Sequence, residues 1–130
     1  MCGILGGNVF KDIGEVKNGL TSMFHRGTDG NSIFQFESGM YMTHNRLSIQ
    51  DLSESANQPL ISDDGRYYLA FNGELWKSTF DKFDKPLRKK YQFKTDKSDS
   101  ELLLYFIIEY KDNLKQMLNE LEGMFSFAFY

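Results

Sequence analysis

Two short polar turns constrain the fold of this chain more than any other feature. Asp63-Asp64-Gly65 interrupts an otherwise apolar stretch and is typical of a β-hairpin turn. Glu37-Ser38-Gly39 joins the segments 32–36 and 40–48, which are rich in residues that favour strands. Both turns therefore predict pairs of neighbouring strands that run antiparallel.

The rest of the chain alternates between strand-like and helix-like segments. The expected strands are 2–10, 32–36, 40–48, 60–61, 67–71 and 124–130, and the expected helices are 15–24, 102–110 and 113–121. Ser98 and Glu101 form a capping-box pattern before the second helix, and Gly123 is expected just after the third as its C′ residue. The segment 74–91 has helical periodicity, but Pro86 is expected to interrupt it or to start a second helix.

Composition excludes several classes of protein. The chain of 130 residues suits one domain, and its net charge of −3 argues against general affinity for nucleic acid or an anionic membrane. No apolar run approaches the ~20 residues that span a bilayer, and no signal peptide precedes Cys2. One cysteine excludes an internal disulfide and fits a reducing cytoplasm, and cysteine and histidine are too few for a structural zinc site.

Cys2 is the only cysteine and follows Met1 directly. Removal of Met1 would leave one residue with both a thiol and a free α-amine. An N-terminal amine titrates near neutral pH and can activate the nucleophile of its own residue as a general base. Taken alone, a cysteine at position 2 is more simply explained as an accident of a frayed terminus.

Three further blocks supply the other groups that an amide-hydrolysing site requires. Asn72 can donate from its side chain and Gly73 from its backbone to a developing oxyanion. Arg46 can pair with the α-carboxylate of an amino acid and Asp99 with its α-ammonium. Each block has a plainer interpretation: a surface ion pair for Arg46, a turn for Asn72-Gly73, and an anion that complements a helix dipole for Asp99.

Taken together and in order, the blocks resemble the glutamine amidotransferase domain of the asparagine synthetase family, which is the class II, N-terminal-nucleophile type. The resemblance covers essentially the whole chain. Its motifs are MCGI at 1–4, HRG-x-D at 25–29, RLSI-x-D at 46–51, QP at 58–59, FNGE at 71–74, SDSE at 98–101 and LEGMFSFAFY at 121–130. Thr28 stands where this family usually has proline, and we interpret the loop 25–29 as structural.

The resemblance implies an α+β fold, a four-layer α/β/β/α sandwich of two antiparallel sheets. It implies that the residues 1–130 are the N-terminal part of a glutamine amidotransferase type 2 domain, truncated at its C-terminal end, with no synthetase domain. By resemblance, Cys2, Asn72 and Gly73 are the catalytic residues. The expected substrate-binding residues are Arg46, Leu47, Ile49, Gln50, Asn72, Gly73, Glu74 and Asp99.

The implied reaction is hydrolysis of L-glutamine to glutamate and ammonia through a γ-glutamyl thioester on Cys2. The implied partner is a synthetase domain or subunit that accepts the ammonia. The glutaminase step needs no cofactor and no metal, since ATP and magnesium belong to the synthetase domain. A different class of function stays open, in which the chain is a non-catalytic interaction module because Met1 is retained or the sheets are incomplete.

Overall fold

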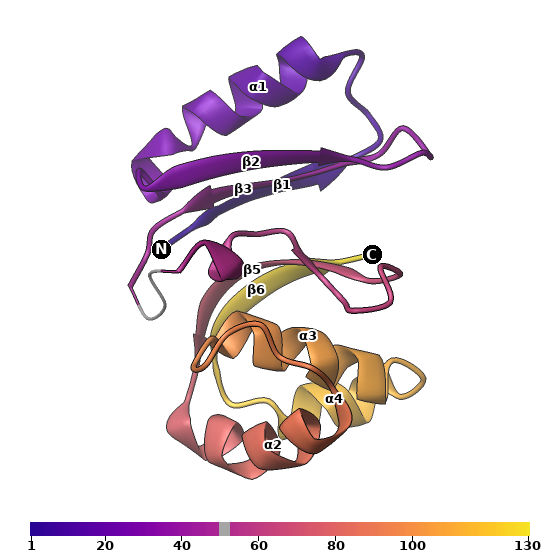
Figure 1. Ribbon diagram of the computed structural model, residues 1–130. Coiled ribbons are helices and arrows are strands. Elements are labelled where there is room, and N and C mark those ends of the chain that lie inside the picture. The colour runs from indigo at the N-terminus through magenta and orange to yellow at the C-terminus, as the bar shows by residue number, and fades with distance from the viewer. Residues whose placement is uncertain (50–52) are drawn as a thin grey trace.

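The computed structural model describes residues 1–49 and 53–130 as a stack of four layers (Figure 1). The helices are α1 (Ile13–Ser22), α2 (Lys77–Lys90), α3 (Asp99–Tyr110) and α4 (Leu114–Glu120), with short 3-10 turns at Phe24–Arg26 and Glu54–Ala56. The strands are β1 (Gly3–Gly7), β2 (Gly30–Gln35), β3 (Tyr41–Arg46), β4 (Leu60–Ile61), β5 (Tyr68–Leu75) and β6 (Gly123–Phe129).

The strands form two antiparallel sheets that stack face to face, in the orders β1-β3-β2 and β4-β5-β6. Helix α1 covers the outer face of the first sheet. Helix α3 packs against the outer face of the second, and α2 and α4 pack against α3 (Figure 1). This arrangement confirms the predicted α/β/β/α sandwich. The N-terminus lies between the two sheets (Figure 1), and Cys2 lines a cavity that also contains Arg46 of β3 and Asn72 of β5.

Both predicted hairpins are confirmed. Gly39 and Gly65 have positive φ angles of 80° and 71°, which L-residues with a Cβ rarely adopt, so glycine is required in each turn. In the second hairpin, the backbone N–H of Gly65 donates to the carbonyl of Ser62 at 2.9 Å, and Asp64 Oδ1 accepts from the hydroxyl of Ser62 at 2.7 Å.

Several strand boundaries differ from prediction. Strand β1 ends at Gly7 instead of extending to residue 10, and β2 begins at Gly30, two residues earlier than expected. Strand β5 continues through Asn72-Gly73, so the alternative interpretation of this pair as a turn is wrong; the pair lies in the strand opposite Ser126 and Phe125 of β6. Strand β3 ends at Arg46 instead of extending to Ser48, because the backbone of residues 47–48 bonds to side chains of Cys2 and Asp29 and not to a neighbouring strand.

Helix α3 is the centre of the larger core. Every residue from Asp99 to Ile107 is buried, as expected of a helix that is covered on all sides. Ser98 caps it as predicted, accepting from the N–H of Glu101 at 3.4 Å. The carboxylate of Glu101 does not return to Ser98 as a capping box would; it accepts from the N–H groups of Lys94 and Thr95 at 2.8 Å each.

Two helical predictions are corrected. Helix α2 runs unbroken through Pro86, because Pro86 lies on the exposed face, where water can bind the carbonyl that loses its intrahelical donor. Gly123 is not the C′ residue of α4, whose C-cap is Leu121; it opens β6 instead. Glycine is needed there because a Cβ would collide with the backbone of Glu74 and lie 3.0 Å from the Cα of Leu75.

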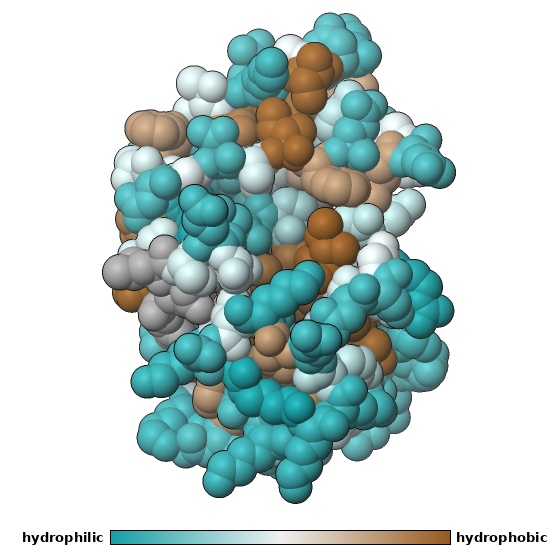
Figure 2. Space-filling model, viewed as in Figure 1, coloured by the Kyte–Doolittle hydropathy of each residue, from teal (hydrophilic) through white to brown (hydrophobic). Residues whose placement is uncertain are grey.

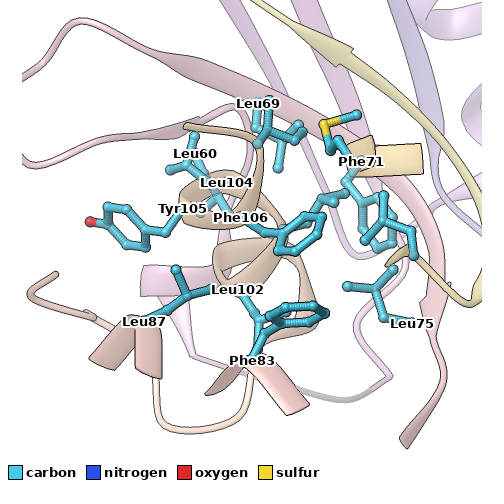
Figure 3. Close-up of a cluster of buried hydrophobic side chains, with 14 residues drawn as sticks. Leu60, Leu69, Phe71, Leu75, Phe83, Leu87, Leu102, Leu104, Tyr105 and Phe106 are labelled. Atoms are coloured by element: carbon cyan, nitrogen blue, oxygen red, sulfur yellow. The ribbon is translucent and has the colours of Figure 1, made fainter. Parts of the chain in front are cut away.

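The two cores differ in size. The larger lies between the second sheet and its helices and includes Leu69, Phe71, Phe106 and ten or more other buried apolar residues (Figure 3). The smaller lies between the sheets, with Phe36, Met42 and Ala70 as its buried residues. On the face shown in Figure 2, hydrophilic residues cover most of the helical layer, and hydrophobic residues gather in the middle and upper parts. Among the described residues, no helix combines the length and the apolar character that crossing a bilayer requires.

Candidate active site

One cavity of about 250 Å³ brings together the chemical groups singled out in the sequence. Its walls come from the N-terminus, the end of β3 and the segment that follows it, the middle of β5, and the first turn of α3. The lining residues are Met1, Cys2, His44, Arg46, Leu47, Ser48, Ile49, Ala56, Gln58, Phe71, Asn72, Gly73, Glu74, Ser98, Asp99, Ser100 and Met124.

The thiol of Cys2 lies beside the backbone of Leu47. Its Sγ accepts from the N–H of Leu47 at 3.4 Å and is 3.8 Å from the carbonyl of the same residue. The guanidinium of Arg26 donates from Nε to the carbonyl of Cys2 at 2.9 Å, which fixes the chain just after Met1. Met1 itself is 71% exposed and lies at the cavity, so its removal would leave the amine of Cys2 facing the same space.

The loop 25–29 supports the strand end that carries Arg46. A Cβ on Gly27 would lie 2.5 Å from the carbonyl oxygen of Asn45, so only glycine allows this approach. The N–H of Asp29 donates to the carbonyl of Arg46 at 2.9 Å, and Asp29 Oδ2 accepts from the N–H of Ser48 at 2.7 Å. The loop therefore has the structural role that we expected, and it shapes one wall of the cavity.

Strand β3 presents His44 and Arg46 on one face, as the period of two predicts. Arg46 donates from Nη1 to Asn57 Oδ1 at 2.6 Å. His44 is almost fully buried, and its Nε2 is 3.1 Å from the carbonyl oxygen of Phe71 in the other sheet. Burial lowers the pKa of His44 to about 4, a change that the Phe71 carbonyl opposes and the charge of Arg46 reinforces. The imidazole is therefore neutral near pH 7. Its proton is on Nε2, because the carbonyl oxygen of Phe71 can only accept a hydrogen bond.

Strand β5 carries Asn72 and Gly73 along the cavity. Gly73 has a φ of 154°, and a Cβ there would collide with the carbonyl of Met124 and lie 2.7 Å from the Cα of Phe125. Glycine is therefore required on both conformational and steric grounds. The side-chain oxygen of Asn72 is buried and has no hydrogen-bond partner among the described residues. An unmatched buried polar atom calls for an explanation, and a functional site is a common one.

The opposite wall is acidic. Asp99 is 7% exposed, and its Oδ2 accepts from the N–H of Leu75 at 3.1 Å. Burial raises the pKa of Asp99; the N–H groups of Leu75 and Ser100 counteract this rise, and the charge of Glu74 adds to it. Asp99 and Glu74 thus form a wall that favours a bound cation, while Arg46 provides a positive charge on the other sheet.

The structure brings together all the predicted site residues that it describes. These are Cys2, Arg46, Leu47, Ile49, Asn72, Gly73, Glu74 and Asp99. Gln50 lies outside the described residues. The sequence analysis assigned no role to His44 or Gln58. His44 was expected on the same face of its strand as Arg46, and Gln58 belongs to the QP motif at 58–59. Their roles depend on contacts with β5 that no local pattern reveals.

Comparison with known proteins gives the family. Residues 1–130 match the glutamine amidotransferase domain family along their whole length. The chain belongs to this family. It is 37% identical, over all of its length, to the probable glutamine-hydrolysing asparagine synthetase of Schizosaccharomyces pombe. It is 35% identical, over 83% of its length, to the glutamine-hydrolysing asparagine synthetase B of Escherichia coli. The predicted class II amidotransferase domain of the asparagine synthetase type is thereby confirmed.

The match covers only part of these relatives. The amidotransferase domain described here spans 23% of the Schizosaccharomyces pombe protein and 18% of the Escherichia coli protein. The chain is also 30% identical, over 89% of its length, to a protein of Penicillium rubens named amidase chyE, of which it spans 16%. Domains of this kind therefore occur in relatives with different names.

Metal ligands do not cluster in the described ranges. No group of three or more histidine, cysteine, aspartate or glutamate side chains in residues 1–49 and 53–130 is placed to hold a metal ion.

Proposed function

We propose that this domain hydrolyses the side-chain amide of L-glutamine to glutamate and ammonia, with Cys2 as the nucleophile once Met1 has been removed. The observation that supports the proposal is the set of chemical groups that line the cavity described above. It combines the only thiol, a guanidinium, an acidic wall and the pair Asn72-Gly73. Its volume, about 250 Å³, is slightly below the range of about 300–1,000 Å³ that is usual for small-molecule sites.

Charge complementarity supports an amino acid as substrate. The two charges of an α-amino acid lie close together, and the cavity offers Arg46 from the first sheet and Asp99 from the first turn of α3. The guanidinium would bind the α-carboxylate in a planar, charge-assisted geometry. The buried carboxylate of Asp99, with Glu74 beside it, would bind the α-ammonium. The substrate's side chain would then point toward Cys2.

In the first step, the α-amine of Cys2 takes the thiol proton and Sγ attacks the amide carbon of glutamine. The oxyanion that forms accepts hydrogen bonds from the side-chain N–H of Asn72 and the backbone N–H of Gly73. The amine then gives its proton to the leaving nitrogen, the C–N bond breaks, and ammonia departs from a γ-glutamyl thioester. Water attacks the thioester with the amine again as base, which releases glutamate and restores the thiol.

The use of the ammonia is part of the proposal. The relatives named as glutamine-hydrolysing asparagine synthetases favour delivery to a synthetase domain or subunit, and the amidase relative leaves the acceptor open. The hydrolysis itself is proposed to need neither cofactor nor metal. A reducing compartment such as the cytoplasm suits a site that depends on a free thiol.

The decisive experiment compares the chain with and without Met1. With Met1 attached, the nitrogen of Cys2 is an amide whose lone pair is delocalised, so it cannot accept the thiol proton. Both forms would be verified by mass and assayed for ammonia from glutamine between pH 6 and 9. Only the processed form should be active, with an apparent pKa between about 6.5 and 8. Cys2→Ala in the processed form should abolish the activity and preserve the fold.

Two outcomes would contradict the proposal. Equal activity of the two forms would rule out the N-terminal amine as the base. Absence of activity from a folded, processed chain would favour the alternative function, a non-catalytic interaction module.

A further inference from the structure

Strand β5 is tied to the first turn of α3 at two points. At one point, the N–H of Leu75 donates directly to Asp99 Oδ2 at 3.1 Å. At the other, the N–H of Phe71 donates to Gln58 Oε1 at 2.5 Å, and Gln58 Nε2 donates to Ser100 Oγ at 3.2 Å. The amide of Gln58 thus connects the strand to the helix, and Gln58, Phe71 and Ser100 are all buried.

In an antiparallel pair, the backbone groups of successive residues point alternately toward and away from the neighbouring strand. This alternation explains why the N–H of Phe71 needs a side chain as its acceptor. Tyr68 and Tyr130 exchange both of their backbone hydrogen bonds, at 2.9 and 3.0 Å. Every second residue after Tyr68 therefore faces β6, while Phe71, Gly73 and Leu75 turn their N–H and C=O groups to the opposite side. Strand β4 pairs there only as far as Leu69, so beyond this point side chains take the place of a neighbouring strand.

The two ties enclose the residues that the proposed chemistry uses. Asn72 and Gly73 lie between Phe71 and Leu75, and all the intervening residues line the cavity. The partners on α3, Asp99 and Ser100, are adjacent in sequence. The two ties therefore set how far the oxyanion donors lie from the carboxylate that would hold the substrate's ammonium.

We propose that Gln58 is a positioning residue of this site: its carboxamide holds the donor pair of β5 at a fixed distance from Asp99. This inference rests on the proposed glutaminase function. Gln58 itself is anchored from the first sheet, because the hydroxyl of Ser32 donates to its backbone carbonyl. His44, also from the first sheet, binds the carbonyl of Phe71, so both backbone groups of Phe71 are held by side chains.

A plainer interpretation is that Gln58 only satisfies a buried N–H and stabilises the core. The two interpretations differ at Ser100. If Gln58 acts only on stability, losing the bond to Ser100 affects unfolding alone. If Gln58 sets a distance, losing that bond lowers kcat even though the N–H of Phe71 keeps its partner, because a displacement of about 1 Å can lower a rate by about 10².

The experiment uses the processed protein with Gln58→Met, Ser100→Ala and the double variant. Thr79→Val is the matched control, because Thr79 is equally buried and bonds to the backbone of Glu122, away from the cavity. Glutaminase kinetics, urea unfolding and equilibrium binding of glutamate are measured for each protein. Glutamate reports on the charged ends of the substrate site without requiring an oxyanion. Hydrogen exchange at the amides of Phe71 and Gly73 reports directly on the strand.

We expect Gln58→Met to lower kcat by about 10² while glutamate affinity changes by less than about twofold. Ser100→Ala should lower kcat in the same direction, and the double variant should be no worse than Gln58→Met, because both changes remove one shared bond. The amides of Phe71 and Gly73 should exchange faster in Gln58→Met than in Thr79→Val. The control should lose stability and keep its kcat.

The inference is overturned if Gln58→Met and Thr79→Val behave alike, both losing stability with unchanged kcat. It is also overturned if the two amides exchange at the parent rate in Gln58→Met. The N–H of Phe71 loses its direct acceptor under either interpretation, so Gly73, two residues further along the strand, is the amide that distinguishes them. Exchange does not require turnover, so an amide of Gly73 that exchanges no faster in Gln58→Met than in Thr79→Val overturns the inference even if the parent protein releases no ammonia. A folded, processed parent protein that releases no ammonia would refute the proposed function, and this result is separate from the test of Gln58.

Discussion

His44 should make the stability of this domain depend on pH in a way that one substitution removes. The folded protein holds its pKa at about 4, against 6.5 for an exposed imidazole, chiefly because the ring is buried between the sheets. Between these two pH values, the unfolded chain binds a proton that the folded chain does not. The free energy of unfolding must therefore fall as the pH is lowered through this range.

The size of the effect follows from the two pKa values. Proton uptake by the unfolded state, less the small uptake by the folded state, lowers the unfolding free energy by about 2.5 kcal/mol between pH 7.5 and pH 4.5. His44→Gln removes this contribution and keeps a side-chain N–H that can donate to the carbonyl of Phe71. All other titratable groups are the same in both proteins, so their effects cancel in the difference.

The assay is urea unfolding followed by circular dichroism at several pH values between 7.5 and 4.5, for the parent and His44→Gln. The difference between the two unfolding free energies should change by about 2.5 kcal/mol in favour of the variant as the pH falls. Parallel curves over the whole range would refute the reasoning, because they would show that His44 takes up its proton equally well in the folded and unfolded protein.

Three further predictions concern the cavity and its support. Arg46→Ala and Asp99→Asn should each weaken glutamine binding by about 2–5 kcal/mol, measured as KM and by calorimetry. Burial raises the pKa of Asp99, so its carboxylate is protonated more readily as the pH falls. The KM of the parent should therefore rise with falling pH, and the KM of Asp99→Asn should not. Asn72→Ala should lower kcat by about 10²–10³ with little change in KM, and a raised KM at unchanged kcat would show that it binds only the ground state. Glu101→Gln should lower the free energy of unfolding, measured in urea, by about 1–3 kcal/mol, since it puts an N–H₂ against the N–H of Thr95 or Lys94, and it should leave kcat unchanged.

Local signals predicted the parts of the fold that short-range geometry decides. The turns at Gly39 and Gly65 and the cap at Ser98 each depend on residues within a few positions of one another, and all three were predictable. Pro86 and Gly123 were misinterpreted because neither is decided by residues close to it in the sequence. Solvent on one face of α2 allows the proline, and the backbone of β5 requires the glycine.

The site shows the same division. The types of residue at Cys2, Arg46 and Asp99 indicate the chemistry, and the structure places all three on one cavity. Gln58 and His44 could not be assigned roles from the sequence, because each acts through the backbone of Phe71, which is 13 and 27 positions away. A side chain that replaces a missing strand neighbour leaves no periodic pattern.

The seam between the two sheets has a consequence for cooperativity. Cys2 and Arg46 belong to one half of the sandwich, and Asn72, Gly73 and Asp99 belong to the other. The halves are joined by a small apolar core and by hydrogen bonds such as that between His44 and the carbonyl of Phe71. Proteins open locally in cooperative units of unequal stability. The half that contains β4, β5, β6 and the helices α2, α3 and α4 holds the larger core. If the halves separate slightly, the proposed nucleophile leaves the proposed oxyanion donors although most of the secondary structure survives. Ammonia release would then report on the docking of the sheets long before circular dichroism registers any loss of helix.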